Sequence, residues 1–222
     1  INENTGWLSG AYGLVRKTTN AGLNWINIAD PQIDGYVFDI KFLNENTGWV
    51  TSGTSFVTNG IMKSTNGGLN WFTQNTHIEL NEWYMRFNIL DSNNIFSVGD
   101  FGRMLKTTNL GNNWILMSKG TVFCMQKMQF LNPNTGWTLA NGYLDGLVYK
   151  TTDGGSNWNT ISYFINKRFT RLKFFNENTG ICVGEYGRII RTTNQGSSWT
   201  DIQSGTGADL LSLFFINENI GY

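Results

Sequence analysis

Charged side chains are scarce in this sequence. Only 14 % of its 222 residues are Asp, Glu, Lys or Arg, and 16 acidic residues balance 16 basic ones. A net charge of zero argues against a general electrostatic attraction to nucleic acid or to an anionic membrane surface. The low charge does not indicate disorder, because aromatic residues make up 14 % of the chain and nine of them are Trp. We therefore expect a folded protein without a nucleic-acid partner.

Histidine, cysteine and long apolar runs are also scarce or absent. The sequence has one histidine, His77, and two cysteines, Cys124 and Cys182, with no CxxC motif or Cys/His cluster. A structural zinc site or a Ser-His-Asp triad has almost no residues to use, so we expect neither metal nor cofactor. Both cysteines lie in strand-like apolar segments, which favours buried, unpaired thiols, although pairing stays open. No apolar run approaches about 18 residues, so we expect no membrane insertion.

Asparagine and glycine are abundant instead. The sequence has 29 Asn and 26 Gly but only two Pro, so two turn-forming residue types supply about a quarter of the chain. No segment keeps an apolar period of 3.6 residues, so we expect almost no helix. This composition is typical of many short strands joined by tight turns.

Two short strings recur along the sequence in a fixed order. The first, TTNAGLNW in its earliest copy, occurs five times, and the Trp residues that end it are 41 to 46 residues apart. The second, NENTGW or a close variant, also occurs five times and is degenerate once more as DSNNIF at 91–96. A period of this length indicates propeller blades. The first string occupies 18–25, 64–71, 107–114, 151–158 and 192–199, and the second occupies 2–7, 44–49, 132–137, 176–181 and 217–222.

Each repeat divides into four expected strands, which we name A to D. Strand A alternates over 37–44, where the apolar residues share one face and Asp39 and Lys41 share the other. The first repeat lacks strand A, and each strand D begins at the Trp of the first string. The other expected strands include B at 47–53, C at 102–109 and a last strand A at 209–217.

The first string has a local physical interpretation. Thr18 and Asn20 carry short side chains that can accept hydrogen bonds from nearby backbone N–H groups. Gly22 supplies a position with positive φ, and Trp25 can pack the turn onto its sheet. Four of the five copies carry Asn where 151–158 carries Asp153, which fits a structural role that needs no charge.

Two further recurrent features also indicate construction of the repeat. The NENTG strings resemble half of a calcium loop, but their Asn oxygens are neutral and the later ligands are missing, so we expect an Asx-type turn. A cation also precedes the first string in every repeat. These cations are Lys17, Lys63, Lys106, Lys150 and Arg191.

The pattern S/T-x-D/N-x-G-x-x-W resembles the Asp-box of the sialidase-like (BNR) β-propellers. Together with the G-x-[YF]-G turn ahead of strand C, it is similar to propellers of the photosystem II stability/assembly-factor type. The resemblance covers essentially the whole chain and implies an all-β propeller domain over 1–222, built from four-stranded antiparallel blades. Five Asp-box repeats fit either a closed five-bladed ring or part of a six- to eight-bladed one. The chain begins within a repeated motif and lacks an initiator Met and a signal peptide, so we expect it to be excised from a longer chain.

The turns between strands B and C supply the first candidate binding residues. The resemblance implies that ligands meet the face formed by the B–C and D–A loops, opposite the Asp-boxes. Aromatic rings and carboxylates on this rim could hold a sugar or a peptide by stacking and hydrogen bonding. The alternative is that the rings pack between blades and the acids are solvated turn residues. The candidates are Tyr12, Asp100, Phe101, Tyr143, Asp145, Glu185 and Tyr186.

The polar face of the A strands supplies a second set of candidates. If this face looks into a central channel, five cations surround one acid, and the channel is positive although the chain is neutral. Such a channel suits a carboxylate, a phosphate or an acidic peptide terminus. An Arg-rich patch is associated with partner binding in the assembly-factor propellers, but its residues cannot be matched one by one, and inter-blade salt bridges are the alternative. The cations are Lys41, Arg86, Lys127, Arg171 and Lys173.

The expected function is binding and not catalysis. The Asp-box is a folding device, the Arg-Ile-Pro signature of sialidases is absent, and their Tyr–Glu nucleophile pair cannot be placed by motif. We expect a non-enzymatic binding or scaffold propeller with a protein or peptide partner, within a secreted, periplasmic or cell-surface bacterial protein. The competing interpretation is a glycan-binding or glycan-hydrolysing propeller that uses rim carboxylates such as Asp100 and Glu185. The identity of the ligand and the oligomeric state stay open.

Overall fold

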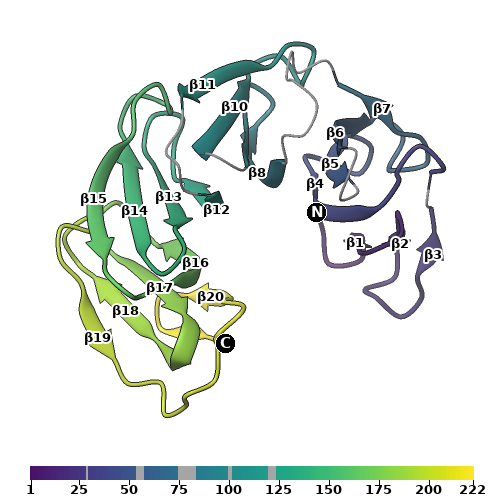
Figure 1. Ribbon diagram of the computed structural model, residues 1–222. Helices are drawn as coiled ribbons and strands as arrows, with labels where there is room; N and C mark the ends of the chain where they lie inside the picture. Colours follow the sequence, from purple (N-terminus) through teal and green to yellow (C-terminus); the bar gives the residue numbers. More distant parts are fainter. Residues whose placement is uncertain (29, 54–57, 75–83, 100–101, 120–123) are drawn as a thin grey trace. The chain divides into compact units, whose positions relative to one another are not determined.

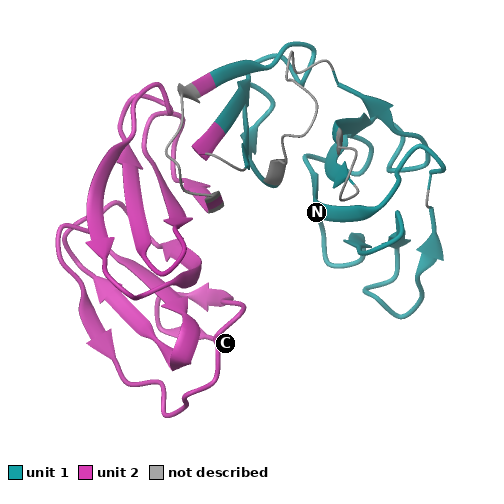
Figure 2. Cartoon of the chain, in the orientation of Figure 1, with its two compact units in different colours: residues 1–100, 104–116 teal, residues 101–103, 117–222 magenta. Residues whose placement is uncertain are grey.

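The structure is a computed structural model of residues 1–222 (Figure 1). It describes the chain except residues 29, 54–57, 75–83, 100–101 and 120–123. His77, Asp100 and Phe101 therefore lie outside the described residues, as does the side chain of Cys124. The chain forms two compact units (Figure 2), of which unit 1 comprises residues 1–100 and 104–116, and unit 2 comprises residues 101–103 and 117–222. Repeats are numbered 1 to 5 by their copies of the Asp-box string.

Unit 1 is built from antiparallel sheets. Repeat 1 forms a three-stranded sheet in the order β1-β2-β3, which confirms that it lacks strand A. Repeat 2 forms a four-stranded sheet in the order β4-β5-β6-β7, and the four-stranded sheet of repeat 3 lies mostly in this unit. The strands are β1 (Gly6–Ser9), β2 (Val15–Thr18), β3 (Ile26–Asn27), β4 (Tyr36–Phe42), β5 (Gly48–Gly53), β6 (Thr58–Ser64), β7 (Phe72–Thr73), β8 (Tyr84–Asp91), β9 (Asn94–Gly99), β10 (Arg103–Thr107) and β11 (Ile115–Lys119).

Unit 2 holds the four-stranded sheets of repeats 4 and 5 and a short hairpin. Each sheet follows chain order, from strand A at one edge to strand D at the other. The B–C turn of repeat 5 is a 3₁₀ turn, η2 (Glu185–Gly187). The strands are β12 (Cys124–Phe130), β13 (Gly136–Asn141), β14 (Gly146–Thr151), β15 (Asn159–Phe164), β16 (Phe169–Phe174), β17 (Gly180–Gly184), β18 (Ile189–Thr192), β19 (Thr200–Ile202), β20 (Phe215–Asn217) and β21 (Ile220–Gly221).

The strand expected at 209–217 is shorter than predicted. Only Phe215–Asn217 is a strand, which pairs with β21 in a short hairpin, and the backbones of Phe214 and Tyr222 exchange two hydrogen bonds beyond it. Leu210 binds repeat 5 instead, since its N–H donates to the carbonyl of Gly184 at 3.0 Å and its carbonyl accepts the Thr170 hydroxyl. The number of blades in the ring and its closure stay predictions.

The Asp-box string closes on itself as its residues predict. In repeat 1, Thr18 Oγ1 accepts the N–H of Gly22 at 3.0 Å, and Asn20 Oδ1 accepts the N–H of Asn24 at 2.9 Å. Gly22 has a φ of +84°. The same two bonds recur at 2.9–3.0 Å in the other four copies, whether the acceptor is an Asn or Asp153. The string therefore needs an oxygen acceptor and not a charge.

The NENTG strings form the expected Asx turns. Asn44 Oδ1 accepts the N–H groups of Asn46 and Thr47 at 3.0 and 2.8 Å. The first Asn of the string makes the same two bonds in repeats 1, 4 and 5. The turn thus satisfies its own backbone groups and explains these Asn residues without a metal.

Stacked rings join neighbouring repeats within each unit. Trp7 of repeat 1 stacks on Phe42 of repeat 2 with ring centroids 3.8 Å apart, and its indole N–H donates to the Gly67 carbonyl at 3.0 Å. In unit 2, Trp137 of repeat 4 makes the equivalent contacts with repeat 5. The second string is therefore an inter-repeat clamp as well as a turn.

The Trp of the Asp-box string packs toward the preceding repeat. Trp71 is buried in one cluster with Val15 of repeat 1, and Trp114 is buried in one cluster with Trp49 of repeat 2. Trp25 departs from the predicted packing and is 36 % exposed.

Most of the recurrent cations make contacts that support the repeats, as expected. Lys63 Nζ donates to the Leu110 carbonyl in the next Asp-box at 2.6 Å, and Lys150 Nζ donates to the side-chain Oε1 of Gln195, at the same position of the Asp-box of repeat 5. The ammonium groups of Lys17, Lys63, Lys106 and Lys150 lie 5.0–5.7 Å from aromatic ring centroids. Arg191 is exposed and pairs across the sheet with Ile181, which stands where other repeats have a ring.

Replacing Asp153 with Asn is expected to change the unfolding free energy at pH 7 by less than about 0.5 kcal/mol, because Asn serves in the other copies. The pKa of Asp153 is lowered, chiefly by the backbone N–H and then by the side-chain amide of Asn157. A carboxyl with a lowered folded-state pKa stabilises the fold above its unfolded pKa of about 4 and loses that contribution as the pH falls through the folded pKa. Below about pH 4 the wild type should therefore lose stability relative to Asp153→Asn. Urea denaturation at pH 7 and pH 3 measures this, and parallel pH curves for the two proteins would contradict it.

Candidate functional site

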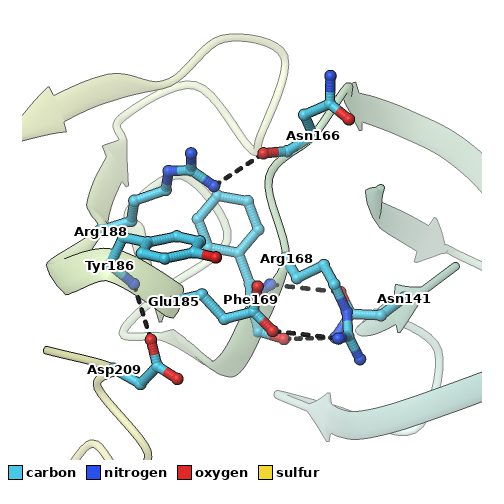
Figure 3. Close-up of polar contacts among 8 residues, drawn as sticks. All are labelled: Asn141, Asn166, Arg168, Phe169, Glu185, Tyr186, Arg188 and Asp209. Carbon is cyan, nitrogen blue, oxygen red and sulfur yellow. Dashed lines mark hydrogen bonds and ion pairs between the residues drawn. The ribbon is translucent and has the colours of Figure 1, made fainter. Parts of the chain in front are cut away.

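Unit 2 contains an open hollow of about 600 Å³ on the loop side of repeats 4 and 5. It is formed by the B–C turn of repeat 4, the D–A loop between β15 and β16, the 3₁₀ turn η2, and the segment that follows β19. Figure 3 shows the polar side chains around it. The lining residues are Tyr143, Leu144, Asn166, Arg168, Glu185, Tyr186 and Asp209.

The turn at η2 presents Tyr186 to solvent. Its four-residue sequence GEYG closes with the N–H of Arg188 donating to the Glu185 carbonyl at 3.3 Å. Tyr186 takes a φ of +57°, and its N–H donates to Asp209 Oδ1 at 2.9 Å (Figure 3). The ring of Tyr186 is 70 % exposed. The bond to Asp209 therefore fixes the backbone of this turn while the ring stays open to a ligand.

The B–C turn of repeat 4 presents a second ring. The N–H of Gly142 donates to the Asp145 carbonyl at 2.8 Å, which closes the turn, and Tyr143 at its tip is 92 % exposed. Asp145 Oδ1 accepts the N–H of Asn166 at 2.8 Å, and its other oxygen accepts the Tyr163 hydroxyl. The Tyr163 hydroxyl bond, followed by the Asn166 bond, lowers the pKa of Asp145. Asp145 thus anchors the neighbouring D–A loop as an anion.

An ion pair and two arginine contacts hold the wall of the hollow. Arg168 Nη1 lies 3.1 Å from Glu185 Oε1, and both side chains are about one-third exposed. Arg188 Nη1 donates to the Asn166 carbonyl at 3.0 Å, and its guanidinium lies 5.7 Å from the Tyr186 ring centroid (Figure 3). These contacts tie η2 to the D–A loop. The charged groups of the wall are therefore positioned before any ligand arrives.

Behind the wall, an amide clamps strand A of repeat 5. The side chain of Asn141 donates from Nδ2 to the Phe169 carbonyl at 2.7 Å and accepts the Phe169 N–H at Oδ1 at 3.3 Å. Both residues are buried. This pair fixes the start of β16 directly after Arg168, so the arginine leaves the sheet at a defined point.

Comparison with known proteins identifies the fold. No protein-family model and no curated protein matches the sequence. A structure of YCF48 bound to a D1 peptide is similar over 99 % of this chain and 86 % of that chain, with 15 % identity and a TM-score of 0.53. A GH74 enzyme from Niastella koreensis matches 86 % of this chain and 34 % of its own, with 17 % identity and a TM-score of 0.67, and an ancestral GH74 enzyme matches 91 % and 30 %, with 17 % identity and a TM-score of 0.72. The chain has a β-propeller fold. The propeller spans about a third of these GH74 enzymes, and at these identities the likeness concerns the fold.

The structure brings three of the predicted rim residues of the propeller together. Tyr143, Glu185 and Tyr186 line the hollow, and Asp145 lies beside it through its bond to Asn166. Tyr12 occupies the equivalent turn of repeat 1, in unit 1, with a φ of +58° and 92 % exposure. All three tyrosines are largely exposed. Whether the predicted residues bind a ligand stays a prediction.

Sequence reasoning missed the D–A half of the hollow. Asn166 and Arg168 come from a D–A loop that was expected to share the ligand face, but neither residue was singled out. Asp209 was expected to be the first residue of a strand at 209–217 and lies instead in the segment between β19 and β20. The only signal available for Arg168 was its position directly before the start of a strand A.

Of the A-strand cations, Arg86 makes a contact between neighbouring A strands. Arg86 Nη1 donates to the Phe38 carbonyl at 2.5 Å, and the N–H of Phe87 donates to Asp39 Oδ2 at 2.8 Å. These groups join repeats 2 and 3 through hydrogen bonds to backbone atoms. Among the other cations, Lys41 is exposed, Lys127 and Lys173 are half-buried, and Arg171 donates to the Thr170 carbonyl at 2.7 Å.

A reactive thiol, a metal site and a membrane-spanning helix are not found in the described part of the propeller. Cys182 is buried and unpaired, as expected, and burial raises the pKa of its thiol far above the usual range, which disfavours the reactive thiolate. Among the described residues, no three His, Cys, Asp or Glu side chains gather as a metal site requires. No helix in that part of the chain is long and apolar enough to cross a membrane.

Proposed function

We propose that this propeller is a non-enzymatic binding module that holds a peptide segment of a protein partner in the hollow of unit 2. The observation that carries the proposal is the pairing of two exposed tyrosine rings, Tyr143 and Tyr186, with a pre-positioned wall of charged and amide groups. Tyrosines of this kind supply a large contact area at a low entropic cost, and fixed polar groups supply orientation.

The polar groups suit a peptide backbone. The wall offers donors on Arg168 and acceptors on Glu185 and Asp209 within one hollow. A peptide has both donors and acceptors in each residue, so a mixed wall can satisfy it. The structure of YCF48 bound to a D1 peptide supports the idea that a propeller of similar size can hold a peptide.

The carboxylates favour binding over glycoside hydrolysis. A hydrolase needs one carboxylic acid whose pKa is raised so that it can donate a proton. The pKa of Asp145 is lowered instead, Glu185 is paired with Arg168, and Asp209 accepts a backbone N–H. We accordingly propose that the site has no catalytic acid. Glycan binding remains the competing function, and the experiment below separates it.

We further propose that the protein works in a secreted, periplasmic or cell-surface setting. This part of the proposal is supported by the resemblance of the repeats and by the neutral, Asn-rich composition. Cell fractionation of the source organism followed by immunodetection tests it, and recovery in the cytoplasmic fraction alone would contradict it.

Selection of displayed random peptides against the full chain, alongside a glycan array, tests the function. We expect enriched peptides whose affinity falls at least about tenfold in the double variant Tyr143→Ala with Tyr186→Asn. Asn is chosen at Tyr186 because it tolerates the positive φ of this position. The matched control is Phe72→Ala, which removes an exposed ring from strand β7 in unit 1 and should leave binding unchanged. Glycan binding that depends on the two tyrosines, or no peptide enrichment, would overturn the proposal.

A further inference from the structure

The charges that line the hollow do not cancel. Arg168 and Glu185 neutralise each other through their contact at 3.1 Å, while Asp209 has no cation partner among the residues that the structure describes. The lining residues therefore carry one net negative charge, that of Asp209. Arg188 and Asp145, which bind Asn166 beside the lining, have opposite charges and leave this balance unchanged. A hollow with this balance attracts a cationic group more strongly than an anionic one.

Asp209 is held in place with one oxygen free. Its Oδ1 accepts the N–H of Tyr186 at 2.9 Å, which fixes the carboxylate beside the base of the tyrosine (Figure 3). In the described part of the chain its Oδ2 has no hydrogen-bond partner. A fixed carboxylate with a free oxygen can accept a charge-assisted hydrogen bond without reorganising.

The aromatic rings of the hollow are suited to the same kind of group. Tyr143 and Tyr186 are both largely exposed, and ring faces attract ammonium and guanidinium groups. The structure already contains one such contact, because the Arg188 guanidinium lies 5.7 Å from the Tyr186 ring centroid. The hollow therefore combines a free carboxylate oxygen with accessible rings.

We propose that the hollow receives a basic side chain, lysine or arginine, of the bound peptide. The inference rests on the proposed function and names the residue type that the peptide must offer. The ammonium or guanidinium group binds Asp209 Oδ2, and the aliphatic part of the side chain packs on Tyr143 and Tyr186.

An acidic side chain fits the hollow less well. Arg168 is paired with Glu185, and its Nε atom is buried away from the surface. Arg188 is bound to the Asn166 carbonyl. An incoming carboxylate would have to separate the Arg168–Glu185 pair, which costs free energy. It would then also be repelled by the carboxylate of Asp209.

Titration of the full chain with three acetylated, N-methylamide amino acids, monitored by NMR, tests this inference. The lysine derivative should shift the backbone amides of Tyr186 and Asp209 and the ring signals of Tyr143. The norleucine derivative, which has a similar chain without the charge, and the glutamate derivative should shift them much less. Because exposed charges are screened, we also expect the response to lysine to weaken as salt is raised from about 0.05 to 0.5 M.

Asp209→Asn isolates the charge. Asn keeps an oxygen that accepts the Tyr186 N–H, so the turn is preserved, while the affinity for the lysine derivative should fall about three- to fivefold. The matched control is Asp34→Asn, since Asp34 is an exposed D–A loop residue of unit 1 whose Oδ1 also accepts a backbone N–H. Equal shifts with norleucine or glutamate, or an unchanged affinity in Asp209→Asn, would overturn the inference.

The two proposals fail in different ways. If selected peptides depend on Tyr143 and Tyr186 but lack lysine and arginine, the basic-residue inference is wrong and the peptide-binding function stands. If the lysine derivative binds the hollow and no displayed peptide is enriched, the peptide-binding function is wrong and the preference of the hollow for cations stands.

Discussion

Replacing Gly187 with Ala is expected to destabilise unit 2 by about 3 kcal/mol. Gly187 ends the turn η2 with a φ of +69°, a region that L residues other than Asn and Asp rarely adopt. A Cβ at this position would lie 1.9 Å from the carbonyl oxygen of Thr206 and 2.8 Å from Ser204 Oγ. The clash is with backbone, so a side-chain rotation cannot relieve it. The segment after β19 must move, and this segment carries Asp209.

A second glycine of the same segment provides the control. Gly205 also has a positive φ, +76°, but a Cβ there would meet nothing within 4 Å. Gly205→Ala should therefore cost only the conformational term, about 1 kcal/mol. Urea denaturation of the two variants measures the difference, and hydrogen exchange of the Tyr186 amide reports whether its bond to Asp209 is lost. Similar stability of the two variants would show that the segment yields to the Cβ.

The parts of the fold that the sequence predicts well are those that close locally. The Asp-box is formed by side chains that bind backbone groups two to four residues away, as Thr18 binds Gly22 and Asn20 binds Asn24. Such bonds need only the right residue types at fixed spacing, so they can be predicted from the string itself. The same reasoning accounts for the Asx turns.

The candidate site was predicted only in part because its other half is not periodic. Tyr143 and Tyr186 stand in B–C turns, so position in the repeat points to them. Asp209 and Arg168 stand in D–A loops that differ from one repeat to the next, and Asp209 binds Tyr186 across 23 residues of sequence. Neither residue type nor spacing marks such a contact before the fold is known.

The polar face of the A strands illustrates a different limit. Alternation predicts that Asp39 lies on the face opposite the apolar residues, but it does not show what that face meets. In the structure, Asp39 accepts the N–H of Phe87 in the next repeat, while Arg86 donates to the carbonyl of Phe38. A charged residue can form hydrogen bonds with the backbone of a neighbouring repeat, or it can bind a ligand. The sequence does not distinguish these two roles.

Replacing Trp137 with Ala is expected to cost about 3–5 kcal/mol, the range for truncation of a large buried aromatic residue. Trp137 is fully buried and stacks on Phe174 of repeat 5, with ring centroids 4.0 Å apart and planes inclined by 13°. Its indole N–H donates to the Gln195 carbonyl in the Asp-box of repeat 5 at 3.3 Å. The substitution therefore removes a stack, a hydrogen bond and the packing between two blades at one step.

Two comparison variants separate these contributions. Trp137→Phe keeps a ring against Phe174 but loses the indole hydrogen bond, so it should cost about 1 kcal/mol for the bond, plus a smaller packing loss than Ala. Trp25→Ala removes a Trp that is 36 % exposed and should cost less than half as much as Trp137→Ala. Thermal and urea unfolding rank the three. Because each repeat is stabilised chiefly by its neighbours, we expect Trp137→Ala to lower the stability of repeats 4 and 5 together. Loss of hydrogen-exchange protection in repeat 4 alone would show instead that the stacked pair does not couple the two blades.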